Sequence, residues 1–376
     1  MRSWRYGAAV LAAITLTTGS LLQPAIGVRT VFAPGVGNGG GAVDAEAAAA
    51  PKLPVGELPE KRNRSSKTER GSDGKLTTTL FANSIHYRDN KGKWQPIDSR
   101  LTGTSEKGYS WVNGANRFRS FFKKQVDDEY LRIDVGAHSY SLSLDGSASG
   151  QGRVDGASAF YSGALPNVDL RYDVEADAVK ETVLLNSATA ATSYQFLLKT
   201  PAEASILPSE SSPGAWQVMM PGQVRPVLVM DAPTVRDSAP GGAVTAPERK
   251  PVSLSVTKLT SGQFQLDLAI DAIWLHSASR TFPVLLDPTF VIQPDAVDRT
   301  FYACSGCGGF GGNYLYIGTD NNNAYRAGLK FDLSSIPMGA VVNGAQLIVT
   351  TENVIVATNP ASSHLGNRAG AGYALE

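Results

Sequence analysis

Val168-Asp169-Leu170-Arg171-Tyr172-Asp173-Val174 alternates apolar and polar residues along its whole length. Successive side chains of a β-strand point to opposite faces, so this period of two predicts a strand with one face on a core and the other toward solvent. The same alternation recurs in three further segments, at residues 131–135, 140–144 and 264–270. The sequence therefore predicts an all-β fold, with a large antiparallel β-sandwich over residues 75–289.

Short polar loops join the predicted strands. Asp89-Asn90-Lys91-Gly92 lies between two segments with strand character, residues 85–88 and 93–97. Asn and Gly tolerate the positive φ angles that tight hairpin turns require. Residues 136–139 separate the next pair of strands in the same way. Both places are predicted hairpins.

Length and composition bound the possible functions. The chain has 376 residues, of which 42% are hydrophobic and 18% charged, and this excludes a wholly disordered chain and a coiled coil. Lys and Arg total 34 against 34 Asp and Glu, so no net field attracts a nucleic acid, and we expect no nucleic-acid partner. Two Cys and four His are too few for a zinc framework, and we expect no metal and no cofactor.

The first 27 residues have the features of a signal peptide. Arg2 and Arg5 precede a mostly apolar stretch at residues 7–22, and Ala25-Ile26-Gly27 supplies small residues for cleavage. An uncleaved anchor is the alternative, but threonines dilute the apolar run, which a membrane-spanning helix needs at about 20 residues. We expect a secreted protein, extracellular or attached to the cell wall, with no membrane contact after cleavage.

Residues 28–74 are predicted to be a flexible linker, because they lack sustained apolar periodicity. Gly35-Val36-Gly37-Asn38-Gly39-Gly40 matches the G-x-G-x-x-G pattern of dinucleotide sites. That motif requires a preceding strand and a following helix, and neither flanks it here. The linker therefore predicts no phosphate-binding loop.

Several stretches resemble the N-terminal, pre-repeat region of secreted bacterial Rhs-type or wall-associated proteins. They lie at residues 85–89 (IHYRD), 92–98 (GKWQPID), 161–172 (YSGALPNVDLRY), 179–181 (VKE) and 282–289 (FPVLLDPT). The resemblance covers most of the predicted sandwich. It implies an exported shell protein that precedes repeats and a toxin domain.

Residues 290–376 resemble the start of a DNRLRE-type module, a jelly-roll domain related to polysaccharide-binding modules. The matching stretches are residues 294–297, 311–318, 325–333, 336–340 and 345–349. From Asp295 only 82 residues remain, whereas a jelly roll needs about eight strands. We therefore expect an incomplete module and a truncated chain.

The sequence contains few groups arranged for chemistry. Cys304-Ser305-Gly306-Cys307 lies among glycines and predicts a local disulfide after export, with a free thiol pair as the alternative. The oxygen donors of residues 320–323 fit a turn better than a calcium loop. Asp127, Asp128 and Glu129 are interpreted as a solvated hairpin tip rather than an acid–base pair.

The four histidines, His86, His138, His276 and His364, each stand alone in the sequence. No hydrolase, metalloprotease or P-loop motif occurs, so the sequence predicts no catalytic residues and no enzyme.

Candidate sugar-binding residues lie in the second module. Aromatic rings stack on the apolar faces of sugars, and cations bind the carboxylates or phosphates of wall polymers. The candidates are Tyr314, Tyr316, Tyr325, Arg326 and Lys330. Tyr314 and Tyr316 share one strand face, which could instead face the core.

The leading hypothesis is a secreted, non-catalytic surface protein that binds cell-wall or extracellular polysaccharide, the front part of an Rhs-like exported protein. The alternative is a structural plug or scaffold of a toxin shell, present here as a truncated remnant. A redox or hydrolytic enzyme is a third, weaker hypothesis.

Overall fold

A computed structural model describes residues 55–81, 83–147, 150–210, 212–238, 250–292, 333–334 and 336–342. It also gives the backbone of short strands at residues 7–9, 13–18, 301–304, 314–316, 318–319, 324–328 and 342–348. The predicted all-β class is confirmed, since the described helices are only η1 (Pro59–Lys61) and α1 (Ala272–Leu275). No helix among the described residues is long and apolar enough to cross a membrane.

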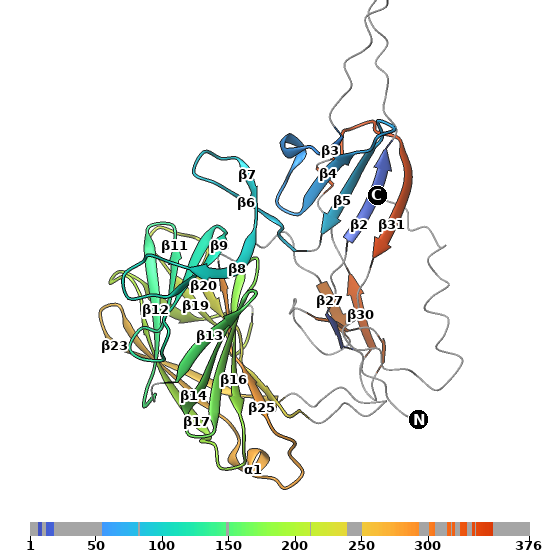
Figure 1. Ribbon diagram of the computed structural model, residues 1–376. Coiled ribbons are helices and arrows are strands. Elements are labelled where there is room, and N and C mark those ends of the chain that lie inside the picture. Colours follow the sequence, from blue (N-terminus) through green and yellow to red (C-terminus); the bar gives the residue numbers. More distant parts are fainter. Residues whose placement is uncertain are drawn as a thin grey trace, which may run out of the picture.

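The first large sheet of the sandwich has eight antiparallel strands (Figure 1). In spatial order they are β23 (Ser253–Thr260), β24 (Gln263–Ala269), β17 (Ser193–Lys199), β12 (His138–Leu144), β11 (Leu131–Val135), β10 (Phe118–Phe122), β9 (Trp111–Ala115) and β8 (Asp98–Gly103). The predicted hairpin at residues 136–139 joins β11 to β12.

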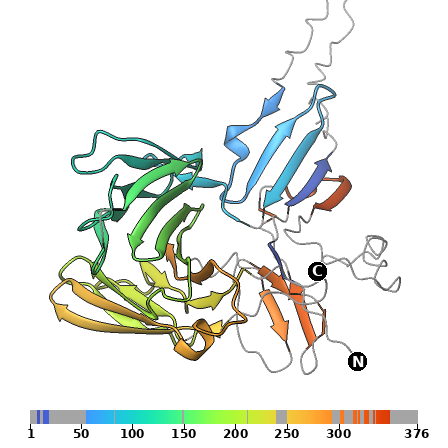
Figure 2. The same ribbon diagram turned by 60° about the horizontal axis from the view of Figure 1, so that its bottom comes forward.

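The second large sheet has eleven strands. Its main path runs β13 (Gln151–Asp155), β14 (Ser158–Leu165), β15 (Val168–Val174), β16 (Ala178–Leu185), β26 (Thr289–Ile292), β20 (Leu228–Met230), β19 (Trp216–Met219) and β18 (Ser205–Pro208). Off this path lie β21 (Thr234–Arg236), β22 (Lys250–Pro251) and β25 (Val284–Asp287). In Figure 2 the strands of both sheets, coloured from teal to orange, gather in one body.

The core lies between these sheets and follows the predicted alternation. In β15 the side chains of Val168, Leu170, Tyr172 and Val174 are buried, whereas the intervening polar residues are partly or fully exposed. One continuous apolar cluster includes residues from both sheets. Burying each such side chain contributes roughly 1.5–3 kcal/mol, so the shared core holds the sheets together.

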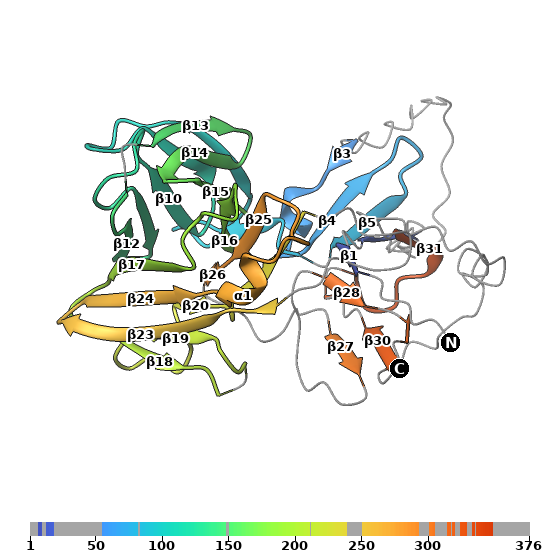
Figure 3. The same ribbon diagram turned by 90° about the horizontal axis from the view of Figure 1, so that it is seen from below.

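Smaller sheets lie beside the sandwich. One has the order β3 (Gly56–Glu57), β4 (Ser66–Arg70), β5 (Leu76–Phe81), β2 (Ala13–Thr18) and β31 (Val342–Ile348). Another joins β27 (Phe301–Cys304), β30 (Ala324–Gly328) and β29 (Gly318–Thr319), and β1 (Gly7–Ala9) pairs with β28 (Tyr314–Tyr316). Figure 3 shows these elements next to the sandwich.

The predicted domain limits differ from the strand pairing in two places. Strands of the two large sheets run from Asp98 to Ile292, and β5 pairs in a separate sheet. The end of the predicted linker forms β3, η1 and β4. The linker prediction missed these strands because their buried positions are polar, so no apolar periodicity marks them. Thr68 and Thr78, for example, are buried, and their hydroxyls lie 2.9 Å apart. The signal peptide at residues 1–27 and the incomplete second module at residues 290–376 stay predictions.

Candidate functional site: a groove on the eight-stranded sheet

An open groove of about 480 Å³ lies on the eight-stranded sheet. It is formed where the β10–β11 loop, the end of β12, and strands β17, β24 and β23 meet. Its polar lining residues are Asp127, Asp128, Ser143, Asp145, Ser147, Gln195 and Gln265. The pocket is thus built by segments that lie far apart in the sequence.

The floor of the groove follows from strand register. Ser143 of β12 is opposite Leu197 of β17, and Leu197 is opposite Gln265 of β24. Their neighbours along each strand, such as Leu198 and Leu266, belong to the core. Because side chains alternate, the floor residues project from the outer face of the sheet.

Two glutamine side chains on this face are held by one carboxylate. Asp267 accepts hydrogen bonds from Gln195 Nε2 at 2.8 Å and from Gln265 Nε2 at 3.0 Å. An amide that donates through its nitrogen retains a carbonyl oxygen as acceptor. Asp267 therefore orients two amide groups within the groove.

The β10–β11 loop forms one wall and is pinned to the sheet. Glu129 adopts a left-handed backbone conformation with φ 55°. Its amide donates to Ser143 Oγ at 2.8 Å, and its carboxylate pairs with Lys199. Lys123 pairs with Asp127 at 2.9 Å. The predicted hairpin tip is therefore an ordered edge of the groove.

The other end of the groove combines an apolar and an acidic group. The pairing of β23 with β24 shifts register between Lys258 and Thr260. Leu259, within this irregularity, lines the groove and is 48% exposed. Asp145 directly follows β12. No described residue forms a hydrogen bond or ion pair with the carboxylates of Asp128 or Asp145 in the structure.

The groove is equipped to hold a hydroxyl-rich ligand. Carboxylates and amide oxygens accept hydrogen bonds from hydroxyl groups, and serine hydroxyls can donate or accept. Leu259 offers an apolar contact beside them. Polar side chains thus outnumber apolar ones in the lining, which suits a ligand that offers many hydroxyl groups. Among the described residues, no group of three or more His, Cys, Asp or Glu is arranged to hold a metal ion.

The sugar-binding residues expected from sequence lie on other strands. Tyr314 and Tyr316 belong to β28, and Tyr325 and Arg326 belong to β30. Their side chains, and Lys330 altogether, lie outside the described residues, as do the Cys304 side chain and Cys307. The sugar-binding and disulfide assignments stay predictions. Sequence reasoning missed Asp145, Gln195 and Gln265, since only strand pairing brings them to the Asp127 loop.

A second polar group is buried inside the sandwich. The side chain of Glu181 on β16 accepts a hydrogen bond from the Tyr172 hydroxyl, and the hydroxyls of Tyr172 and Tyr130 lie 2.6 Å apart. Burial raises the pKa of Glu181 to about 8. A cavity of about 20 Å³ beside Glu181 is otherwise mainly apolar and has room for about one water. Because Tyr130, Tyr172 and Glu181 are all buried, a polymer cannot reach these three polar groups.

Comparison with known proteins finds three similar curated proteins. They are tRNA nuclease WapA of Bacillus subtilis strain 168, tRNA(Glu)-specific nuclease WapA of B. subtilis subsp. natto, and tRNA3(Ser)-specific nuclease WapA of Bacillus spizizenii. Each is 24% identical over 250 residues, which cover 62% of this chain and 10% of the relative. The match thus spans about a tenth of the relatives' length. No protein-family model and no solved structure matches the chain.

These relatives correct two expectations. The chain was expected to be no enzyme and to have no nucleic-acid partner, and both expectations are contradicted by relatives named as tRNA nucleases. The physical reason for the error is that net charge and short motifs describe this chain alone, whereas the similarity links it to much longer proteins. The similarity is consistent with a cell-wall-associated protein and with an extracellular or wall location.

Proposed function

We propose that this chain is a β-sandwich segment of an exported, wall-associated, Rhs-like protein, and that it binds cell-wall or extracellular polysaccharide. The observation that carries the proposal is the groove on the eight-stranded sheet, with its carboxylates, amides and hydroxyls around Leu259. The similarity to WapA supports the wall location. The predicted residues on β28 and β30 would form a second contact with the polymer.

The groove supports this function through matched hydrogen bonding. Sugar hydroxyls can donate to Asp145 and to the amide oxygens of Gln195 and Gln265, while the apolar face of a sugar ring packs against Leu259. The Asp267 contacts hold both amides in place before a ligand arrives. Such preorganisation lowers the entropy cost of binding.

A binding assay with purified wall polysaccharides and a glycan array tests the proposal. The double variant Gln195→Ala with Gln265→Ala removes two hydrogen-bonding groups and is expected to weaken retention about tenfold. Gln223→Ala is the matched control, because Gln223 is exposed in a loop outside the groove. Retention on no glycan at all would contradict polysaccharide binding and favour the scaffold alternative.

A second candidate function is tRNA cleavage by the protein to which this chain belongs, and the names of the relatives favour it. The described residues bring together three side chains of types that RNA cleavage uses, Glu57, Arg62 and His86. The chain is incubated with tRNA beside the His86→Ala variant. Cleavage that persists in the variant would exclude His86 as an acid or base, and cleavage by neither protein would remove the cluster as a candidate.

A further inference from the structure

The hairpin formed by β6 (His86–Arg88) and β7 (Trp94–Pro96) is a separate ribbon. Among the described residues, neither strand pairs with any other strand. The ribbon lies between the sandwich and the sheet that contains β3, β4 and β5 (Figure 1). An isolated two-stranded ribbon is marginally stable in water, so its order must come from other contacts.

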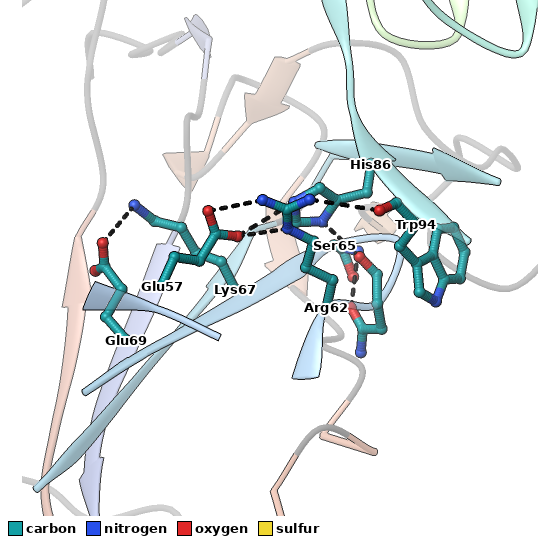
Figure 4. Close-up of polar contacts among 8 residues, drawn as sticks. Glu57, Arg62, Ser65, Lys67, Glu69, His86 and Trp94 are labelled. Atoms are coloured by element: carbon teal, nitrogen blue, oxygen red, sulfur yellow. Dashed lines mark hydrogen bonds and ion pairs between the residues drawn. The ribbon is translucent and has the colours of Figure 1, made fainter. Parts of the chain in front are cut away.

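The base of this hairpin is held by a charged cluster (Figure 4). Arg62 donates to both carboxylate oxygens of Glu57, at 2.7 and 2.9 Å, and Arg62 Nη1 donates to the Trp94 carbonyl at 3.4 Å. His86 Nδ1 lies 2.7 Å from the Asn63 carbonyl oxygen. A carbonyl only accepts, so Nδ1 carries the proton. These contacts tie both strands of the hairpin to the segment before β4.

The charges of this cluster are used within the molecule. Hydrogen bonding to Arg62 lowers the pKa of Glu57, and burial lowers the pKa of His86, whose side chain is 4% exposed. His86 Nε2 lies 3.9 Å from Glu57 Oε1. Because His86 is buried and the guanidinium of Arg62 is bound to Glu57, the cluster is a support for the hairpin.

The turn of the hairpin is ordered by one carboxylate. Asp89 accepts from the amides of Lys91 and Lys93 and from Gln95 Nε2, each at 2.9 Å. Gly92 closes the turn with φ +73°, which a glycine adopts without strain. The hydrogen bond from Gln95 is the largest cause that lowers the pKa of Asp89. The carboxylate of Asp89, which is the one negative charge of the hairpin, is thus occupied by hydrogen bonds within the hairpin.

Three cations remain on the outside of this rigid turn. Arg88, Lys91 and Lys93 are exposed, and with Asp89 they give residues 86–96 a formal charge of +2. The Arg88 guanidinium lies 4.6 Å from the centre of the Trp94 ring, across the strand pair. The ring holds the long arginine side chain in place, which reduces the entropy lost on binding an anion.

We propose that the β6–β7 hairpin binds a phosphodiester polymer of the cell wall, such as a polyol phosphate. Arg and Lys donate charge-assisted hydrogen bonds to phosphate oxygens, and three exposed cations on one short hairpin suit a chain of repeated phosphates. Single-stranded RNA sites add free aromatic faces on which bases stack. Here Arg88 covers the Trp94 ring, and Trp94 is partly buried, so charge is the main attraction.

This contact goes beyond the proposed polysaccharide function, because it uses none of the groove residues. Binding of synthetic poly(glycerol phosphate) is measured at several salt concentrations. For Arg88→Ala with Lys91→Ala and Lys93→Ala, affinity at low salt is expected to fall at least about tenfold, with a shallower salt dependence. Lys91→Gln with Lys93→Gln leaves the Arg88–Trp94 contact intact and is expected to give an intermediate loss.

A matched triple variant, Lys107→Ala with Arg119→Ala and Arg153→Ala, removes the same charge from exposed positions elsewhere. Equal weakening by this control would overturn the proposal, since only net charge would then matter. A tRNA arm decides between classes of polymer: tighter binding of tRNA that needs Trp94 would identify an RNA site instead. The groove variant is expected to bind poly(glycerol phosphate) normally, which separates failure at the hairpin from failure at the groove.

Discussion

The Tyr172 hydroxyl donates a hydrogen bond of 2.5 Å to the carboxyl group of Glu181 inside the sandwich. Both side chains are almost fully buried, and the partner of the Glu181 carboxyl group is a neutral hydroxyl. An ionised carboxylate there would lack solvation, so the protonated form is favoured. The pair links the stability of the fold to pH.

Stability is expected to fall between the ordinary carboxyl pKa of 4.5 and the raised pKa of Glu181, about 8. In this range the folded chain holds a proton that the unfolded chain has released, so raising the pH favours unfolding. Glu181→Gln removes this proton, and urea unfolding at pH 5 and pH 8 should show a flatter dependence. Burial raises the pKa of Glu175 to about 7, so the stability of the Glu181→Gln variant should still fall with rising pH, but less steeply. An unchanged slope in Glu181→Gln would contradict the assignment.

Tyr172→Phe should destabilise the sandwich by about 1–3 kcal/mol, because it leaves the Tyr130 hydroxyl and Glu181 without their shared partner. Tyr109→Phe is the control, since its hydroxyl makes a longer bond of 3.3 Å to the Glu129 carbonyl in a less buried place. Chemical denaturation compares the two. Equal losses of stability would mean that the buried hydrogen bonds of Tyr130, Tyr172 and Glu181 contribute no more than the partly exposed one of Tyr109.

Gly262→Ala should cost more than about 2 kcal/mol of folding free energy. Gly262 has φ +71°, and a Cβ there would lie 2.6 Å from the Thr200 carbonyl oxygen. Gly222 has a similar φ of +76° with open space around it, so Gly222→Ala should cost only about 1 kcal/mol from backbone strain. Thermal unfolding of both variants separates the close contact from the strain, and equal losses would exclude the contact.

His86→Ala should loosen the β6–β7 hairpin without unfolding the sandwich, because it removes the contact with the Asn63 carbonyl. Hydrogen exchange at residues 86–96 is expected to accelerate, while exchange in β15 stays slow. The exposed His276 supplies the control variant, His276→Ala. Unchanged exchange in the hairpin would show that His86 does not anchor it.

The sandwich could be predicted because its strands alternate strictly. In β15 and β24 every apolar position except the last residue of β24 is buried, and the polar positions point outward. Local turn chemistry likewise predicted the β6–β7 hairpin, where Asp89 and Gly92 shape the loop.

The groove and the charged cluster could not be predicted from one sequence. Asp127 and Gln265 are brought together only by the pairing of β12, β17 and β24. His86 stands alone in the sequence, yet it lies beside Glu57 because β6 docks on the segment before β4. β4 was hidden for a different reason, since its buried positions are hydroxyl residues such as Ser66 and Thr68.

Hydrogen exchange of the purified chain, with and without an oligosaccharide from a retained wall polymer, tests the groove most directly. The groove account predicts slower exchange at residues 127–129, 143–147 and 195–197, and loss of this protection in Gln195→Ala with Gln265→Ala. Protection confined to other parts of the chain, or persisting in the double variant, would contradict polysaccharide binding in the groove.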